Sequence, residues 1–165
     1  MGDFEEGMKY WRDAGHVARR TLEAMKDELQ PGKTWHEIIE AAERFIHRHG
    51  GKPAFPGTIA VNNIAAHFTT EHTVTPPEEY EGDMVLKKGD LVKIDYGVHI
   101  KGHIGDNALT FEVGNTNNHT EQIKAAREAR DAAIEMMHPG TPWHKVGEAA
   151  AQPSLDAGFQ PIRNL

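Results

Sequence analysis

The sequence contains no cysteine among its 165 residues, which excludes a disulfide-stabilised scaffold and metal sites built from thiolates. It has no run of about 18 apolar residues, so no segment is expected to span a bilayer. The first six residues, Met1–Glu6, are acidic and lack the apolar core of a secretory signal. These absences together favour a cytoplasmic chain that is neither secreted nor held in a membrane.

Positive charge is also scarce, because 18 lysines and arginines stand against 25 aspartates and glutamates, giving a formal net charge of −7. A general nucleic-acid binder needs a basic surface for phosphate contacts, so direct nucleic-acid binding is not expected. The hydrophobic fraction of 38% is too high for a disordered chain. The length alone suggests one compact domain. The eleven histidines raise the question of a metal site.

The first 53 residues predict two helices joined by a tight turn. In the first segment apolar or small residues recur every three or four positions, at Met8, Trp11, Gly15, Ala18, Leu22, Met25 and Leu29. Pro31-Gly32 ends this helix, and Thr34 with Glu37 is typical of the capping box that begins another. The second helix is expected to end at Gly50-Gly51 and to bury Trp35, Ile38, Ile39, Ala42, Phe45 and Ile46.

The same hairpin occurs twice in the sequence. A shift of 108 positions aligns residues 18–53 with residues 126–161, with 12 identities in 36 ungapped pairs. The repeat predicts a pseudo-symmetric protein with two helical hairpins, each leading into strands. Pro153 lies within the last helix, where we expect a kink or an early end. His36 and His144 occupy equivalent positions in the two copies and are interpreted as structural.

The clearest strand pattern lies between the two hairpins. Residues 92–100 alternate between apolar and other side chains, with the period of two that a half-buried strand shows. Lys101-Gly102 predicts a hairpin turn, followed by a return strand over residues 106–113. With this two-residue turn, Asp95 and Asp106 project from the same face as diagonal neighbours, with Cα atoms about 7–8 Å apart.

Two carboxylates at this separation repel each other when both are ionised, so on a half-buried sheet they need a cation or shifted pKa values. A divalent metal, or two metals bridged by one carboxylate, would satisfy this need. The alternative is a pair of exposed aspartates on a solvated sheet face. His99 and His103 are not obvious further ligands, and His103 lies on the opposite face in this register.

A long polar stretch over residues 68–89 separates these strands from the extended segment predicted over Thr58–Val61. It contains Pro76-Pro77 and is expected to form an exposed loop. Its acidic cluster is interpreted as a solvated surface feature and consists of Glu78, Glu79, Glu81 and Asp83.

Five short motifs occur in order along the chain. They are Ala54-Phe55-Pro56, Asn62-Asn63-x-Ala65-Ala66-His67, Lys93-Ile94-Asp95-Tyr96-Gly97-Val98-His99-Ile100-x-Gly102, Asp106-x-Ala108-x-Thr110 and Pro161-Ile162-Arg163-Asn164-Leu165. Together they resemble the type II methionine aminopeptidases, which have the pita-bread fold, and the resemblance covers essentially the whole chain. The chain is similar to archaeal forms, because it begins without a long charged extension.

The resemblance implies an α+β pita-bread fold of the creatinase and aminopeptidase type. An internally duplicated helical hairpin would combine with a curved antiparallel sheet in one catalytic domain, of which residues 1–165 are the N-terminal part. The first half of the fold would cover about residues 1–113. The helices of the second half would cover about residues 119–165, and the chain would end after this second hairpin.

The resemblance also implies a dinuclear metal site. Asp95 would be a ligand of one divalent ion and Asp106 would bridge two, with Co, Mn, Fe or Zn as the candidate metals. His67 would contact the substrate and the tetrahedral intermediate, Leu165 would contact the substrate, and Phe55 would line an apolar pocket for a methionine side chain. The implied activity is removal of the N-terminal methionine from nascent polypeptides, near the ribosome in the cytoplasm.

The family's other metal ligands, one histidine and two glutamates, are expected beyond residue 165. We therefore expect the 165-residue chain by itself to have little or no peptidase activity. One alternative is a non-catalytic pita-bread protein that binds peptides, ribosomes or other proteins, although such relatives usually lose the ligand residues that are present here. Another is a half-fold that dimerises to rebuild the sheet.

Overall fold

The structure is a computed structural model that describes residues 2–70 and 84–162, without the side chains of residues 2 and 3. The chain folds into two compact units, Met1–Thr116 and Asn117–Leu165, and each is described by itself. The predicted acidic cluster of the long loop and the predicted substrate contact Leu165 lie outside the described residues. Within the described part, no helix has the length and apolarity needed to cross a membrane.

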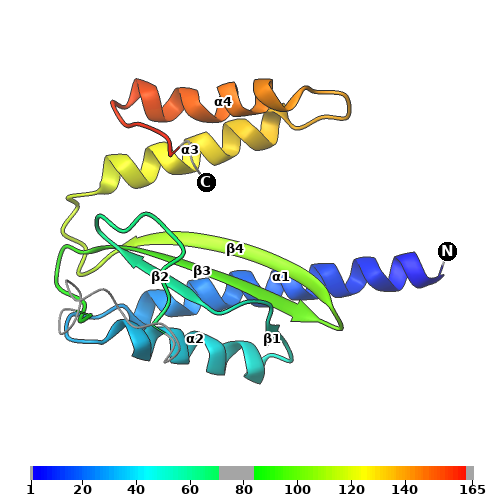
Figure 1. Cartoon of the computed structure of the whole chain (residues 1–165), viewed down its shortest axis with the longest axis horizontal. Coiled ribbons are helices and arrows are strands. Elements are labelled where there is room, and N and C mark those ends of the chain that lie inside the picture. The colour runs from blue at the N-terminus through cyan, green and yellow to red at the C-terminus, as the bar shows by residue number, and fades with distance from the viewer. Residues whose placement is uncertain (1, 71–83, 163–165) are drawn as a thin grey trace. The chain divides into compact units, whose positions relative to one another are not determined.

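The first unit begins with the predicted helical hairpin, formed by α1 (Gly2–Glu28) and α2 (Trp35–Arg48) (Figure 1). The capping box at the start of α2 is present as predicted. The backbone N–H of Glu37 donates to Thr34 Oγ1 (3.2 Å), and the backbone N–H of Thr34 donates to the Glu37 carboxylate (2.7 Å). These two bonds satisfy donors that the first turn of a helix otherwise leaves unpaired.

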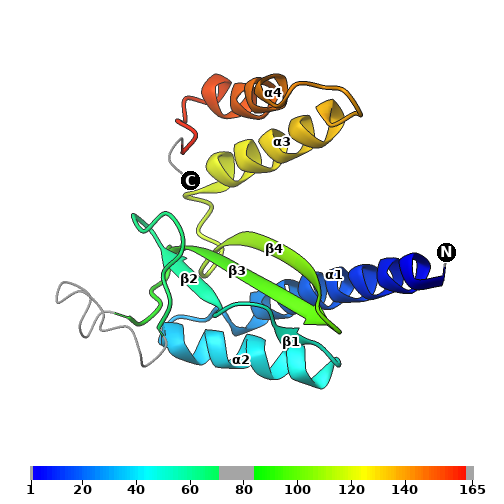
Figure 2. The ribbon, with the colours of Figure 1, turned by 45° about the vertical axis from the view of Figure 1, so that its right-hand side comes forward.

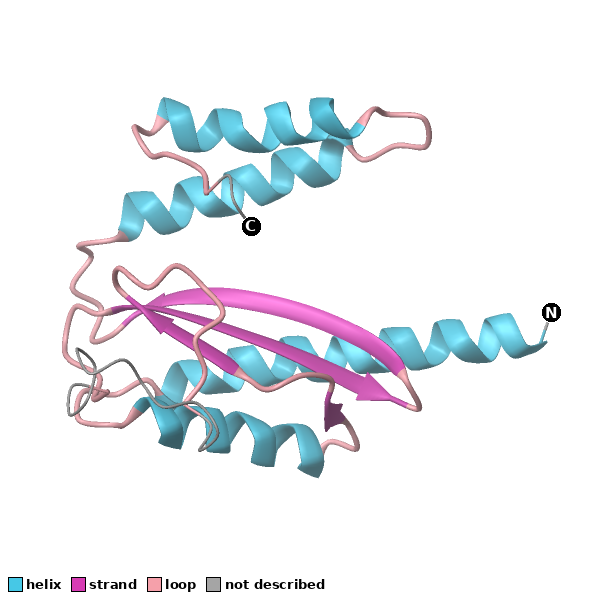
Figure 3. Cartoon of the chain, in the orientation of Figure 1, coloured by secondary structure: helices cyan, strands magenta, loops and turns pink. Residues whose placement is uncertain are grey.

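Four antiparallel strands follow, which are β1 (Lys52–Pro53), β2 (Thr58–Val61), β3 (Leu91–Ile100) and β4 (His103–Glu112) (Figure 3). β4 pairs with β3 along its whole length, whereas β1 and β2 pair with successive parts of the other edge. β3 is therefore the central strand of the sheet. Its register with β4 is the one predicted from the two-residue turn.

Both helices of the first unit pack on one face of this sheet (Figures 1 and 2). The alternation along β3 decides which side chains join the core, because every second residue points toward the helices. Tyr96 is fully buried there, and its hydroxyl donates to the Ile39 carbonyl of α2 (3.2 Å). The opposite face of β3 carries the polar residues, including Asp95.

Of the predicted apolar stripe, Ala18, Leu22, Met25 and Leu29 are buried, but Trp11 is 47% exposed, so its predicted place in the core is wrong. The reason is length. At about 1.5 Å per residue, a 27-residue helix is longer than a ten-residue strand at about 3.4 Å per residue. The N-terminal turns of α1 extend past the sheet in both views (Figures 1 and 2). Phe45 of α2, also predicted to be core, is only partly buried.

The end of the predicted loop 68–89 belongs to the core instead of the surface. Leu86 is 1% exposed, and it pairs through its backbone with the turn between the helices: Gly32 N donates to Leu86 O, and Leu86 N donates to Lys33 O, both at 2.8 Å. Trp35 N also donates to Met84 O (3.0 Å). The prediction of an exposed loop is therefore wrong for this short segment, which pairs with the turn between α1 and α2 although the stretch around it is polar.

The second unit contains the repeated hairpin, α3 (Thr120–Met136) and α4 (Trp143–Asp156). At the predicted shift of 108 positions, α4 begins and ends at the positions equivalent to the ends of α2, and both helices have 14 residues. It continues through Pro153 to Asp156, so the expected early end is wrong. Pro153 has no N–H to donate to the Ala149 carbonyl, so the helix continues past it with one backbone hydrogen bond missing. Trp143 is 76% exposed, whereas its repeat partner Trp35 is 5% exposed.

Candidate active site

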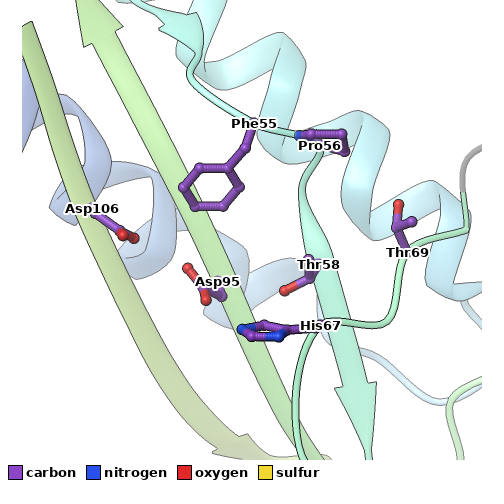
Figure 4. A pocket seen from close by; sticks show the side chains of 7 residues that line it. All are labelled: Phe55, Pro56, Thr58, His67, Thr69, Asp95 and Asp106. Atoms are coloured by element: carbon purple, nitrogen blue, oxygen red, sulfur yellow. The ribbon is translucent and has the colours of Figure 1, made fainter. Parts of the chain in front are cut away.

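The hairpin register brings Asp95 and Asp106 to the same face of the sheet. Asp95 lies opposite Ala108, and Asp106 lies opposite Gly97, so the two aspartates are diagonal neighbours as the sequence predicts. Their side chains meet above the face of the sheet that points away from α1 and α2 (Figure 4). The first step of the argument for a metal site, the pairing of two carboxylates, is therefore confirmed.

The environment of Asp95 is unfavourable for a carboxylate without a counter-ion. Its Oδ1 atom is buried and has no hydrogen-bond partner. Burial raises the pKa of Asp95, the neighbouring Asp106 carboxylate raises it further, and nearby His67 acts in the opposite direction. Among the described residues, neither aspartate forms an ion pair with a lysine or arginine. An unpaired oxygen atom beside a second carboxylate fits a bound divalent cation.

The one lysine close by on this face of β3 is engaged elsewhere. Lys93 Nζ donates to the Asn62 carbonyl (2.8 Å), at the end of β2. Burial lowers the pKa of Lys93, and this hydrogen bond holds its ammonium group away from the aspartates. Asn62 itself bonds Asp90 and the Leu91 backbone, so this corner has a structural role.

His67 lies in the loop after β2, and its imidazole points toward Asp95 (Figure 4). Its backbone has a φ of 61°, in the left-handed region that is rarely adopted by residues other than glycine. The next residue fixes this conformation. The Phe68 carbonyl accepts a hydrogen bond from Ile59 N (2.8 Å), and the Phe68 ring packs edge-on against Trp35 at 5.5 Å between centroids. Backbone strain of this kind persists only where the surroundings impose it.

Phe55 forms the wall of a pocket beside the aspartates (Figure 4). The pocket has a volume of about 420 Å³, in the usual range for small-ligand sites. Its lining combines apolar rings, two hydroxyl groups, an imidazole and the two carboxylates: Phe55, Pro56, Thr58, His67, Thr69, Asp95 and Asp106. Four of the five predicted site residues therefore meet at one place, and the fifth, Leu165, is outside the described residues.

The sequence reasoning missed Pro56, Thr58 and Thr69 as pocket residues. Thr58 lies directly opposite Asp95 in the pairing of β2 with β3. The only signal for it was the extended pattern of residues 58–61, because the register between strands so far apart in sequence cannot be derived from a turn. Thr69 follows His67 in a loop without periodicity, so no pattern pointed to it.

The other histidines that the structure describes do not line this pocket. His103 packs against the rings of Tyr10 and Trp11 in α1, on the opposite side of the sheet, as its register predicts. His36 contacts Thr70 and Glu40, in agreement with its structural interpretation. Among the described residues, no group of three or more histidine, aspartate or glutamate side chains is arranged to hold a metal. The site described so far thus contains two carboxylates that could hold a metal.

Comparison with known proteins places these features in a family. A methionine aminopeptidase from Thermococcus onnurineus is 40% identical over 153 residues, covering 92% of this chain and 48% of that protein. A methionine aminopeptidase from Methanothermus fervidus is 34% identical over 172 residues, covering 98% of this chain and 85% of that protein. The chain thus spans about half the length of the Thermococcus relative.

Solved structures agree with this result. The crystal structure of methionine aminopeptidase from Rickettsia prowazekii matches with a TM-score of 0.82 at 25% identity, covering 97% of this chain and 64% of that chain. Prolidase from Pyrococcus furiosus matches with a TM-score of 0.75 at 26% identity, covering 93% and 43%. These neighbours confirm the predicted pita-bread fold. The model of metallopeptidase family M24 matches residues 9–165, and the chain therefore belongs to that family.

Proposed function

We propose that this chain carries part of the active site of a metal-dependent methionine aminopeptidase. The observation that supports this most is the buried Oδ1 atom of Asp95, which has no hydrogen-bond partner and lies beside the Asp106 carboxylate in a pocket with an aromatic wall. Membership of a metallopeptidase family implies divalent metal ions. The finer assignments, two ions drawn from Co, Mn, Fe or Zn, with Asp95 on one and Asp106 bridging both, belong to this proposal.

Five of the seven pocket residues have a physical task in this reaction. Divalent ions held by the aspartates would supply the Lewis acidity that cleavage of a peptide bond requires. Phe55 and Pro56 offer an apolar surface to a flexible thioether side chain and keep water away from it. His67 presents its imidazole to a substrate bound between Phe55 and Asp95, where it can hydrogen-bond the peptide. Leu165 is retained as a proposed substrate contact.

The proposed substrate is the N-terminal methionine of nascent polypeptides, which places the protein in the cytoplasm, near the ribosome. The support for it is the name of the relatives, methionine aminopeptidase. Direct nucleic-acid binding is not part of the proposal. Cosedimentation of the purified chain with ribosomes translating a Met-Gly reporter tests the ribosomal part, and recovery only in the supernatant would contradict it.

A titration of the purified chain with Mn²⁺ tests the metal part. Mn²⁺ is paramagnetic, so a site at Asp95 and Asp106 should broaden the NMR signals of Phe55, Thr58 and His67 first. Addition of a Met-Gly peptide should then shift the remaining signals of the pocket. The matched control is Asp95→Asn, which keeps the shape of the side chain and removes its charge. This variant should lose the broadening at the pocket.

Two outcomes would overturn the proposal. Broadening by Mn²⁺ that is centred elsewhere on the chain, or that is equal in Asp95→Asn, would show that the aspartates hold no metal. Peptide binding that survives Asp95→Asn unchanged would favour the alternative of a non-catalytic peptide-binding protein. Since the described residues supply two metal ligands, we expect the 165-residue chain to release little methionine by itself. Turnover typical of aminopeptidases would contradict that expectation.

A further inference from the structure

Gly97 does not line the pocket, but it lies beneath Phe55 and next to both aspartates. It is on β3, two residues after Asp95, and it faces Asp106 across the β3–β4 pairing. The space in which a side chain would begin is already filled by the Phe55 ring. A Cβ atom at this position would stand 2.6 Å from Phe55 Cδ1, closer still to Cε1, and 3.0 Å from Ala54 Cβ. The ring therefore rests directly on the strand backbone.

The backbone on both sides of Phe55 is fixed, so only the ring itself can move. Before it, Ala54 N donates to the Gly97 carbonyl (2.8 Å). After it, Gly57 packs closely on the buried Tyr96 ring, and a Cβ there would lie 2.7 Å from the Tyr96 hydroxyl oxygen. That hydroxyl is in turn bonded to α2. The distance of the Phe55 ring from the sheet therefore depends on the absence of a side chain at position 97.

We propose that Gly97 is a specificity-determining position of the pocket, acting through Phe55. Because Gly97 has no side chain, the Phe55 ring lies close to the strand. The pocket is then deep enough for a long, unbranched substrate side chain. A methyl group at position 97 would push or turn the Phe55 ring. The pocket wall would then move inward, and the depth of the pocket would fall by about the size of a methyl group. This inference rests on the proposed function, because it assumes that the methionine side chain lies against Phe55.

The backbone of Gly97 does not itself require glycine. Its φ is not among the positive values that occur at other glycines of the chain, so an alanine is compatible with the strand. The effect of Gly97→Ala therefore arises from packing. Loss of space for one methylene-sized group in an apolar pocket changes affinity by about 10-fold or more. A ligand too short to reach the wall is expected to lose little.

The test measures binding of methioninamide and alaninamide, in the presence of Mn²⁺, by isothermal titration calorimetry. The wild-type chain should prefer methioninamide. Gly97→Ala should weaken methioninamide binding by about 10-fold and leave alaninamide binding within about twofold. The matched control is Gly15→Ala, the same substitution at a position where a Cβ meets nothing within 4 Å. This control should bind both ligands as the wild type does.

A second variant shows whether the effect passes through Phe55 and covers the case in which Gly97→Ala folds poorly. Phe55→Ala removes the ring atoms that the new methyl group meets, so the double variant should fold and should bind methioninamide as the single Phe55→Ala variant does. A double-mutant cycle then gives the coupling between the two positions. Additive effects on methioninamide binding would overturn the inference.

The outcomes separate this inference from the proposed function. If the wild-type chain with Mn²⁺ binds no methioninamide at the pocket, the proposed function fails and this inference fails with it. If the wild type binds methioninamide and Gly97→Ala keeps its full affinity and preference, the proposed function stands and the role of Gly97 is refuted. Selective loss of methioninamide binding, absent in Gly15→Ala, supports both.

Discussion

Asp95 and Asp106 are diagonal neighbours on adjacent strands, and the buried Oδ1 of Asp95 has no hydrogen-bond partner. In the protein without metal, each carboxylate raises the electrostatic free energy of the other. This arrangement is a cost to folding unless a cation binds, because Lys93 is directed toward the Asn62 carbonyl. The pair is thus better explained by ligand binding than by a contribution to stability.

The first prediction is that divalent metal stabilises the chain through this pair. A ligand that binds only the folded state at 100 times its Kd adds about 2.7 kcal/mol to the free energy of unfolding. Thermal melts with Mn²⁺ and with EDTA should therefore separate for the wild type and coincide for Asp95→Asn. With EDTA alone, Asp95→Asn should melt above the wild type, because one of two repelling charges is gone. The exposed Asp27→Asn is the control and should keep the metal response. An equal response in Asp95→Asn would refute the prediction.

The second prediction concerns the left-handed backbone of His67. A residue with a Cβ in this region costs about 1–2 kcal/mol relative to glycine. His67→Gly and His67→Ala both remove the imidazole, but only the glycine relieves the strain at φ 61°. His67→Gly should therefore be more stable than His67→Ala by about 1 kcal/mol in urea unfolding. Equal stabilities would show that the loop relaxes once the imidazole is absent.

The third prediction compares two glycines that face each other across the packing of α1 on β4. A Cβ at Gly105 would lie 2.5 Å from Gly15 N and 2.6 Å from Gly15 Cα, against helix backbone that cannot move aside cheaply. A Cβ at Gly15 itself meets nothing within 4 Å. Gly105→Ala should therefore destabilise the chain by about 1–3 kcal/mol or more through overpacking. Gly15→Ala should stabilise it by about 0.5–1 kcal/mol through helix propensity.

Chemical denaturation of the two variants beside the wild type measures both effects. The opposite signs are the distinctive part of this prediction, because the substitution is identical and the two positions are in contact. If Gly105→Ala were as stable as the wild type, the close approach of α1 to β4 at this point would be wrong, and a destabilised Gly15→Ala would contradict the free space at position 15.

The sequence was informative wherever the relationship between residues is local. The two-residue turn at Lys101-Gly102 determined the pairing of β3 with β4, and with it the position of Asp95 relative to Asp106. The capping box of Thr34 and Glu37 was readable because both residues lie within one helical turn. In the repeat, the second helices, α2 and α4, have matching bounds, and the first helices, α1 and α3, end at the equivalent residues Glu28 and Met136.

Longer-range relationships were not readable. Thr58 meets Asp95 through a pairing between strands separated by a long loop, for which no turn sets the register. The exposure of Trp11 depends on where the sheet ends, and the burial of Leu86 on which turn it reaches. Trp35 and Trp143 are identical residues at equivalent positions of the repeat, but only Trp35 is buried. Within the described residues, strands accompany the first hairpin and not the second, and the sequence repeat does not reveal this difference.

The last prediction is a pH dependence of stability at the start of α2. Hydrogen bonds from the Thr34 backbone and hydroxyl lower the pKa of Glu37 below its ordinary 4.5. A carboxyl group whose pKa is lower in the folded state stabilises the fold above its unfolded pKa, and this contribution is lost as the pH falls through the folded pKa. Glu37→Gln keeps the side-chain acceptor but cannot ionise. The wild type should thus be more stable than Glu37→Gln at neutral pH, and the difference should disappear on acidification below about pH 4.5.

Thr34→Ala is the control. It should lower stability by about 1 kcal/mol yet keep most of the pH dependence, since the backbone N–H of residue 34 remains the main partner of Glu37. Parallel stability curves for the wild type and Glu37→Gln across this pH range would contradict the assignment.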